Sequence, residues 1–259
     1  MTTGKSSFLP PDVTISIVSH GDSDKVSVLL ESLRLCEPAR RFQVLLTDNL
    51  GTDLPDHAGN EKTTINIILN QRPQGFSKNH NKALQQARAG LVCILNPDVV
   101  FLQPIFERLG NLLDTGKTNI AAPLMVDQNG TVQDSFRPIP RPLDIVKRRL
   151  PGYKFSPSSA DADGCIWPDW IAGACMIMKR ETYRRLHGFD ERYHLYFEDV
   201  DFCTRARLLG LKILVDTGVR IRHDSPHNSR RSLTYLLWHL QSAIRFYRSP
   251  TYKAAIRIA

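Results

Sequence analysis

Two segments of this sequence contain carboxylates that could do chemistry, and the first is the triplet Asn96-Pro97-Asp98. It follows the apolar run Leu91–Leu95, so we expect Asp98 at the end of a buried strand. A carboxylate there can ligate a divalent cation that bridges two phosphates, because hard cations prefer oxygen ligands. Pro97 would turn the backbone and project Asp98 away from the strand. All three residue types also form ordinary turns, so the triplet alone fits a plain turn as well.

The second group is the segment 197–201 (FEDVD), which places three carboxylates in four positions ahead of a helix. One of them is positioned to accept a proton from an attacking hydroxyl. The neighbouring rings of Tyr193, Tyr196 and Phe197 would shield that carboxylate from water and could stack on sugar rings. The alternative is structural: acidic helix capping, with Asp201 paired to Arg205 at the i,i+4 spacing.

A third segment, Gly75 to Asn81 (GFSKNHN), lies between an apolar run and a helical pattern. Glycine permits close approach of the backbone, and a helix N-terminus favours phosphate. The segment matches neither a P-loop nor the G-x-G-x-x-G pattern. It fits a polar connector equally well.

The elements that must position these residues alternate between strand and helix in the first half of the chain. Repeated β-α-β patterns predict an α/β fold with a doubly wound, mostly parallel sheet. Such sheets bind ligands beyond the carboxyl ends of their strands, where Asp48, Asn49 and Asp98 all fall. The expected strands are Val13–Ser19, Phe42–Thr47, Thr64–Leu69 and Leu91–Leu95, and the expected helices are Lys25–Cys36 and Lys78–Ala89.

The second half is less regular. Ser135–Pro168 is rich in Pro, Arg, Ser and Asp and predicts a long functional or disordered loop, with one short helix around Leu143–Leu150. Beyond it we expect a strand over Ile171–Met178, a helix over Asp199–Leu209 closed by Gly210, and a helix over Ser232–Tyr247 with an apolar stripe.

Composition excludes several classes of protein. The 259 residues, 42% hydrophobic and 23% charged, fit one globular domain with a small extension. Met1–Asp12 does not resemble a signal peptide, and no run approaches the ~18 apolar residues of a membrane span. We therefore expect a cytoplasmic protein, either free or on a membrane surface. The five cysteines are odd in number and lack a C-x-x-C spacing, which argues against a disulfide framework or a zinc site.

The net charge of +8 is concentrated near the C-terminus. The segment from Arg205 to Ala259 contains eleven Lys and Arg residues and two acidic residues. Such a surface attracts nucleic acid, anionic lipid or phosphorylated ligands, and charge alone does not choose among them.

In this order the motifs resemble the family 2 inverting glycosyltransferases, which have a nucleotide-diphosphosugar (GT-A type) fold. Within that family the chain is most similar to the bacterial rhamnosyltransferases of O-antigen and related polysaccharide assembly. The resemblance covers about Val13 to Tyr247. The matching runs are SIVSHG (16–21), LLTDN (45–49), GFSKNHN (75–81), ILNPDV (94–99), DWIAGACMIMKR (169–180), GFDERYHLYFEDVDFCTR (188–205) and His223, and the stretch WHLQSAIRFY supports the closer similarity.

The resemblance implies a role for each matching residue. Asp199 would be the general base for the acceptor hydroxyl. Asp98 and His223 would lie at the metal and diphosphate, with Mg²⁺ or Mn²⁺ as cofactor, whereas Asn96 replaces the first carboxylate of the D-x-D motif. The donor nucleotide would be bound by Ser19, Asp48, Asn49, Gly75, Asn79, Asn81 and Asn96. Trp170, Gly173 and Glu198 would border the sugar and acceptor pocket.

The implied reaction is transfer of L-rhamnose from dTDP-β-L-rhamnose, with inversion, to a lipid-linked glycan. The preferred acceptor is GlcNAc on undecaprenyl diphosphate, in the synthesis of O-antigen or another surface polysaccharide. The expected domains are a glycosyltransferase domain over residues 1–228 and a basic amphipathic extension over 229–259. The nucleotide half would span about 13–100 and the acceptor half about 101–228.

The Ser232–Tyr247 stripe is either the buried face of a packed helix or a surface that lies on the cytoplasmic face of the inner membrane. Arginines that flank it favour lipid, and a second basic group could hold a lipid diphosphate or form a solvated loop. The first set is Arg230, Arg231, Arg245 and Arg248, and the second is Arg137, Arg141, Lys147, Arg148 and Arg149.

Three other functions compete with this interpretation. A UDP-sugar donor, carrying galactose or glucose, would use the same site. A basic nucleic-acid-binding module would leave the strand-end carboxylates unexplained, so we expect no nucleic-acid partner. A nicotinamide dehydrogenase is disfavoured because Ser19-His20-Gly21-Asp22 lacks the glycine fingerprint. An inactive homologue is disfavoured because Asp98 and Asp199 are both present.

Overall fold

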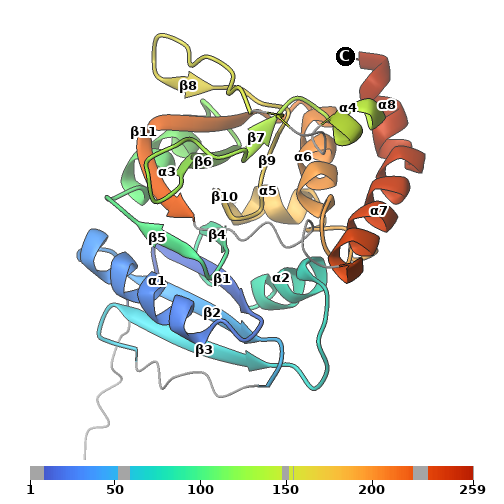
Figure 1. The fold of residues 1–259 in the computed structure, drawn as a ribbon. Coiled ribbons are helices and arrows are strands. Elements are labelled where there is room, and N and C mark those ends of the chain that lie inside the picture. The colour runs from blue at the N-terminus through green and yellow to red at the C-terminus, as the bar shows by residue number, and fades with distance from the viewer. Residues whose placement is uncertain (1–8, 52–58, 148–151, 154, 224–232, 259) are drawn as a thin grey trace, which may run out of the picture.

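A computed structural model describes residues 9–51, 59–147, 152–153, 155–223 and 233–258 of the chain. The described part is built around a nine-stranded mixed sheet in the order β3-β2-β1-β4-β10-β6-β11-β5, with β8 paired to β11 (Figure 1). A separate two-stranded sheet joins β7 to β9. Buried side chains form a core on each face of the main sheet, so the expected doubly wound α/β architecture is confirmed.

The first four strands pair in parallel, β1 with β2, β1 with β4 and β2 with β3. β1 lies between β2 and β4 and is almost fully buried, as expected for a continuous apolar run inside an α/β fold. The predicted strands and the first helix are confirmed to within two residues. Their bounds are β1 (Val13–Ser19), α1 (Ser23–Cys36), β2 (Phe42–Asp48), β3 (Thr63–Leu69), α2 (Phe76–Leu84) and β4 (Leu91–Leu95).

The second half of the sheet mixes strand directions. β10 (Cys175–Lys179) is antiparallel to both β4 and β6 (Ile120–Val126), while β11 (Ile213–His223) runs parallel to β6. The short strands β5 (Val99–Phe101) and β8 (Cys165–Ile166) are both antiparallel to β11. This arrangement brings the end of β11 back beside the residues that follow β4.

Two predicted elements have different bounds in the structure. The helix predicted over Lys78–Ala89 ends at Leu84, because buried polar side chains bind the backbone beyond it. Gln43 donates to the carbonyl of Gln86, and Thr14 accepts from the amide of Ala89. These hydrogen bonds replace those of a further helical turn.

The strand predicted over Ile171–Met178 is in fact two strands. β9 (Trp170–Ile171) pairs with β7 (Phe136–Arg137) outside the main sheet, and β10 begins at Cys175. Between them the backbone of Ala172 donates to Ser135 and that of Gly173 donates to Asp199. An apolar pattern cannot reveal this break, because residues on both sides of it are buried.

The predicted long loop contains the short strands β7 and β8 and the helix α4 (Pro142–Lys147). The helix predicted over Leu143–Leu150 is therefore confirmed as far as Lys147, and Arg148, Arg149 and Leu150 lie outside the described residues. Two further helices, α3 (Phe106–Asp114) and α5 (Arg180–Arg185), complete the cover of the main sheet.

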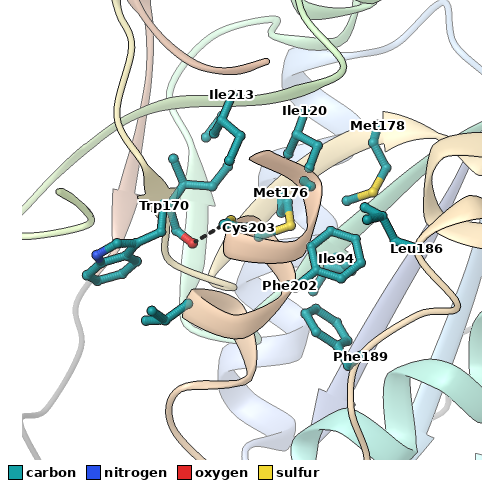
Figure 2. Packing of buried hydrophobic residues seen from close by; sticks show 14 of the residues in the cluster. Ile94, Ile120, Trp170, Met176, Met178, Leu186, Phe189, Phe202, Cys203 and Ile213 are labelled. Atoms are coloured by element: carbon teal, nitrogen blue, oxygen red, sulfur yellow. Dashed lines mark hydrogen bonds between the residues drawn. The ribbon is translucent and has the colours of Figure 1, made fainter. Parts of the chain in front are cut away.

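The helix α6 (Glu198–Leu208) confirms the helix predicted after Phe197, and Gly210 follows it with the positive φ of +72° that the C-terminal turn needs. Figure 2 shows Phe202 of α6 beside Phe189 and Ile94, and Cys203 against the backbone of β9. This packing fixes α6 on one face of the sheet. The orientation of its first turn follows from that contact.

The last two helices, α7 (Leu233–Arg248) and α8 (Pro250–Ile258), run along the outside of α6 (Figure 1). The buried residues of α7 are Ser242, Ala243 and Phe246, whereas its apolar stripe faces outward. The exposed fractions in that stripe are 79% for Leu233, 56% for Leu237, 43% for Leu240 and 52% for Ile244. No helix of the described part is long and apolar enough to cross a membrane.

Candidate active site

A cleft with a volume of about 710 Å³ lies where the ends of β1 and β4 meet the first turns of α6 and α7. That volume suits a bound organic ligand. Most of the residues chosen from the sequence line it together: Asn49, Gly75, Asn79, Asn96, Asp98, Trp170, Gly173, Glu198, Asp199 and His223. Ser19, Asp48 and Asn81 do not line it.

One end of the cleft is formed by Asp98, which follows β4, and His223, the last residue of β11. Asp98 Oδ1 and His223 Nε2 lie 3.2 Å apart, and both atoms are buried without the geometry of a hydrogen bond. Burial alone would raise the pKa of Asp98, but the His223 ring, a backbone hydrogen bond and the charge of Lys25 together outweigh burial, so the pKa is lowered. Asp98 therefore presents an ionised carboxylate to the cleft.

Gln133 orients the His223 ring. The side-chain Nε2 of Gln133 donates to the carbonyl of His223. This bond directs Gln133 Oε1 to His223 Nδ1, at 2.9 Å. This contact assigns a proton to Nδ1 and leaves Nε2 as the nitrogen that could bind a cation. A carboxylate oxygen and an imidazole nitrogen in contact at a buried site fit a cation beside them.

A divalent cation fits this pair. Two neighbouring ligands of an octahedral ion, each at 2.0–2.1 Å, lie about 3 Å apart, close to the observed contact. Within the described ranges no group of three or more His, Cys, Asp or Glu side chains could hold a metal ion. Asp98 and His223 would therefore supply two ligands, and phosphate oxygens and water the others, as is usual for Mg²⁺ at phosphate sites.

The second centre is Asp199 in the first turn of α6. The amide of Gly173 donates to its Oδ2 at 3.2 Å, and the amide of Val200 donates to its Oδ1 at 2.8 Å. Burial raises the pKa of Asp199 above its usual value, although these backbone hydrogen bonds oppose the shift. A carboxylate with a raised pKa is a better proton acceptor at neutral pH.

Glu198 lies beside Asp199 on the cleft and is only 5% exposed. Burial raises the pKa of Glu198 well above its usual value, and the charge of Asp199 raises it further. Its Oε2 is buried without a hydrogen bond. A protonated Glu198 can therefore donate a hydrogen bond into the cleft while Asp199 stays ionised.

The two centres are held on one short segment. Ala174 accepts a hydrogen bond from the amide of Asn96 at 2.9 Å, and its neighbour Gly173 donates to Asp199. A Cβ at position 173 would lie 3.0 Å from the ring of Phe76, so the segment passes close beneath that ring. The break between β9 and β10 thus ties the Asp98 turn to the start of α6.

A strained turn presents α6 to the cleft. Tyr196 and Phe197 have φ angles of 70° and 67°, which are unfavourable for bulky residues and concentrate at functional sites. α7 supports this turn: Ser242 donates to the carbonyl of Leu195 at 2.9 Å, and the Phe246 ring packs 5.5 Å from that of Phe197. The helix α7 therefore takes part in positioning Asp199.

An amide network organises the side of the cleft where the sequence predicts nucleotide binding. Asn70 donates to Asn49 at 2.9 Å and to Asn79 at 2.7 Å, and both Asn49 and Asn79 donate to the carbonyl of Gln74. The network fixes the loop that carries Gly75. Asn70 was not predicted, yet it follows the strand β3 as Asp98 follows β4, so its position at a strand end could have identified it.

Three predicted nucleotide ligands are used differently. Asp48 accepts from the amides of Leu50 and Gly51, and Ser19 accepts from the amide of Asp22, so both buried side chains shape turns at the cleft edge. Asn81 lies elsewhere: it bonds the backbone of Phe189 in both directions and accepts from the Tyr183 hydroxyl. Its role here is structural.

Trp170 is nearly buried and donates from its indole to the carbonyl of Pro138 at 3.1 Å, and it also borders the cleft. It therefore contributes both to packing and to the wall of the cleft. Arg137, expected near a lipid diphosphate, is held by Asp134 and stacks 4.8 Å from the Phe155 ring. Of that basic group, Arg141 and Lys147 are exposed, and Arg148 and Arg149 are not described.

Sequence reasoning missed several residues that line the cleft: His20, Gln133, His194, Tyr235 and Trp238. Gln133 lies in irregular chain and carries no local signal. Tyr235 and Trp238 lie on a helix that was treated as an extension of the domain. Their three-residue spacing, which puts both on one helix face, was the available signal.

Gly75 is required by a close backbone contact. A Cβ at this position would lie 2.5 Å from the carbonyl oxygen of His194, which also accepts a hydrogen bond from Phe76. We expect Gly75→Ala to separate the two segments and lower the stability by about 1–3 kcal/mol. Gly90→Ala is the matched control, because nothing lies within 4 Å of its Cβ. Thermal unfolding should distinguish the two variants, and equal melting temperatures would contradict the steric argument.

Comparison with known proteins agrees with this geometry, although no family model matches the chain. It is 26% identical over 247 residues to rhamnosyltransferase WbbL of Escherichia coli K12, covering 90% of this chain and 92% of that protein. It is also 26% identical to the N-acetylglucosaminyl-diphospho-decaprenol L-rhamnosyltransferase of Mycobacterium tuberculosis, covering 88% of this chain and 81% of that protein.

Among solved structures, GalNAc-T7 with UDP, GalNAc and Mn²⁺ superimposes with a TM-score of 0.63 at 13% identity. The match covers 83% of this chain but only 43% of that protein, so this chain spans less than half of its length. This likeness concerns the fold, which is of the GT-A type. The resemblance drawn from the sequence motifs is confirmed by these comparisons.

Proposed function

We propose that this chain, a glycosyltransferase with the GT-A fold, transfers L-rhamnose with inversion from dTDP-β-L-rhamnose to a lipid-linked glycan. The observation that carries the proposal is one cleft that holds a half-buried Asp199 with a raised pKa and a separate Asp98–His223 pair. An inverting transfer needs a base on the acceptor side and charge stabilisation on the diphosphate side. The basic nucleic-acid-binding alternative explains neither centre.

The reaction is a single displacement. Asp199 takes the proton of the acceptor hydroxyl, whose oxygen forms the new bond to the anomeric carbon. The bond from that carbon to the diphosphate oxygen breaks, and the nucleoside diphosphate leaves with the electron pair. Glu198, in its protonated form, is placed to donate a hydrogen bond to an acceptor or donor oxygen beside Asp199.

Asp98 and His223 would hold a divalent cation, whose chemistry is to neutralise charge on the leaving diphosphate. The Mn²⁺ in the GalNAc-T7 structure supports a divalent ion in this fold, and Mg²⁺ and Mn²⁺ are both candidates here. Asn96, with no charge, contributes backbone shape rather than a second carboxylate. The neutral Asn49 and Asn79 amides line the adjacent wall, where a pyrimidine nucleotide is expected.

The choice of donor and acceptor rests on the named relatives. Both are rhamnosyltransferases, and the mycobacterial one is named for a GlcNAc-diphospho-decaprenol acceptor. We therefore propose GlcNAc on undecaprenyl diphosphate as acceptor, in O-antigen or related polysaccharide synthesis. A UDP-sugar donor remains the alternative within the same site.

The test is turnover of the purified protein with Mg²⁺, a GlcNAc-diphosphate-lipid analogue and either dTDP-rhamnose or UDP-sugars. Rhamnosylated product from dTDP-rhamnose supports the proposal. Product from a UDP-sugar alone would keep the mechanism and refute the rhamnose assignment. If no donor reacts, calorimetry with dTDP and UDP decides whether the nucleotide or the acceptor is wrong.

The position of α7 supports contact with the cytoplasmic face of the inner membrane. Its exposed apolar stripe, defined by Leu233, Leu237, Leu240 and Ile244, lies beside the exposed Arg245 and Arg248. Arg230 and Arg231, also expected to flank it, lie outside the described residues, as does the proposed boundary at residue 228. An apolar stripe with cationic flanks favours an anionic lipid surface.

We expect the wild-type chain to co-sediment with vesicles that contain anionic lipid, and Leu237→Asp to bind them at least ~10-fold more weakly. Leu35→Asp is a matched control, because Leu35 is a similarly exposed leucine of another helix, α1. Equal loss of binding in both variants would refute the role of the stripe.

A further inference from the structure

The cleft has an aromatic wall that none of the roles above uses. Tyr235 and Trp238, one turn apart on α7, both line it, and their ring centroids are 5.2 Å apart with the rings nearly perpendicular. The Trp238 ring also lies 4.7 Å from the ring of His194, a third residue of the cleft. All three rings belong to the C-terminal half of the chain.

This wall lies on the side of the cleft formed by α7 and by the turn before α6. His194 is five residues before Asp199, at the start of the strained turn, and the same helix that carries Trp238 anchors this turn through Ser242 and Leu195. A substrate ring held against these side chains would lie beside the turn that carries Asp199. The phosphate-facing pair, Asp98 and His223, comes from β4 and β11 instead.

The chemistry of the wall suits a sugar ring. Trp238 and Tyr235 are half-buried, so each offers an apolar ring surface to the cleft and keeps a polar edge. Burial lowers the pKa of His194, and the nearby His20 lowers it further, which favours an uncharged ring. A pyranose has one face of C–H groups that packs on such rings, and Glu198 lines the same cleft.

We propose that Tyr235, Trp238 and His194 form a subsite for a pyranose ring of the acceptor. This inference rests on the proposed function, because it assigns the acceptor of that same reaction. The subsite places the ring against α7 and its reacting hydroxyl toward Asp199. From there, a lipid attached to the sugar can leave the cleft along the exposed apolar stripe of the same helix.

The test is steady-state kinetics with a short, water-soluble GlcNAc-diphosphate analogue, which removes any contribution from membrane binding. Trp238→Ala should raise the acceptor KM about 10-fold, while the donor KM stays within about 2-fold of wild type. Trp238→Phe, which keeps an aromatic face, should restore most of the affinity. Trp167→Ala is the matched control: Trp167 is exposed, bonds Asp161 and does not line the cleft.

Two results would overturn the subsite. An increase in the donor KM with an unchanged acceptor KM would assign the wall to the nucleotide base. Unchanged KM values for both substrates would show that the aromatic wall binds neither of them.

Calorimetry with the same acceptor analogue separates this inference from the proposed function. Wild-type binding that Trp238→Ala weakens supports the subsite even if no donor is turned over, in which case the donor assignment has failed. Absence of wild-type binding and of turnover would refute the subsite for this class of acceptor. Thermal unfolding of each variant shows whether it is folded.

Discussion

Asp199→Asn should lower turnover by about 10²–10⁴-fold, the usual contribution of a general base. The substitution keeps the size of the side chain but removes its negative charge and its ability to take a proton. Binding of dTDP, measured by calorimetry, should be unchanged, because Asp98 and His223 are untouched. A variant that keeps more than about a third of wild-type turnover would refute Asp199 as the base.

The pH dependence follows from the raised pKa of Asp199. Activity should increase as pH rises through this pKa, because only the ionised carboxylate accepts a proton, and the increase should occur above the usual range for aspartate. The residual activity of Asp199→Asn should lack that limb. A wild-type profile that is flat from pH 4 upward would contradict the assignment.

Replacing Asp199 should not destabilise the protein in the way that replacing an ion-paired carboxylate does. A carboxylate whose folded pKa is raised destabilises the folded state progressively as pH rises above the unfolded pKa of aspartate. Asparagine removes that cost but accepts fewer backbone hydrogen bonds, so the melting temperature near neutral pH should stay within about 3 °C of wild type.

Asp201→Asn is the matched control in the same helical turn. Asp201 does not line the cleft; it accepts from Arg205 at 2.7 Å, and Arg205 in turn donates to the carbonyls of Leu186 and Gly188. This variant should lose about 1–3 kcal/mol of stability and keep the turnover of its folded fraction. Opposite outcomes for two neighbouring aspartates would separate catalysis from packing.

The sequence predicted the parallel half of the fold well because its signals are local. Each buried strand from β1 to β4 is a short apolar run, and the polar residue that follows it marks the edge where ligands bind. Asp98 and Asn49 were found in this way. Asp48 shares the pattern, yet its carboxylate closes a turn, because a strand end can serve the loop as well as the ligand.

The rest of the site depends on contacts between distant segments, which no local pattern contains. His223 meets Asp98 only because β11 lies beside β5, and Gln133 orients it from irregular chain. Tyr196 and Phe197 adopt the left-handed backbone conformation, and no glycine in the sequence indicates it. Their strain is maintained by packing against α7, through contacts that span 47 to 49 residues of sequence.

These contacts also explain why α7 is more than an appended helix. Its inner face supports the turn before Asp199, its Tyr235–Trp238 side borders the cleft, and its apolar stripe is exposed. A single helix thus contacts the turn before Asp199, one wall of the cleft and the surrounding solvent. Changes on α7 are therefore expected to alter acceptor use before they alter donor binding.

The second large effect on turnover is expected at the Asp98–His223 end of the cleft, where we propose that the diphosphate binds. Asp98→Asn keeps the shape of the side chain but removes the charge that faces His223 Nε2 at 3.2 Å. A neutral amide is a much weaker ligand for Mg²⁺ or Mn²⁺ than a carboxylate, and Asn96 offers no neighbouring charge to replace it. We expect turnover to fall by about 10²–10³-fold, the range found when one group that stabilises developing charge is lost.

The measurement that identifies the cause is dTDP calorimetry with and without Mn²⁺. In the wild-type protein the metal should strengthen dTDP binding, whereas in Asp98→Asn dTDP affinity should be the same with and without it. His223→Ala should show an intermediate loss of about 10–100-fold in metal affinity. Asp163→Asn, an exposed carboxylate paired with Lys117, is the control and should retain the metal effect. If Asp98→Asn keeps that effect, the carboxylate is not the ligand, and its lowered pKa reflects only the adjacent His223 ring.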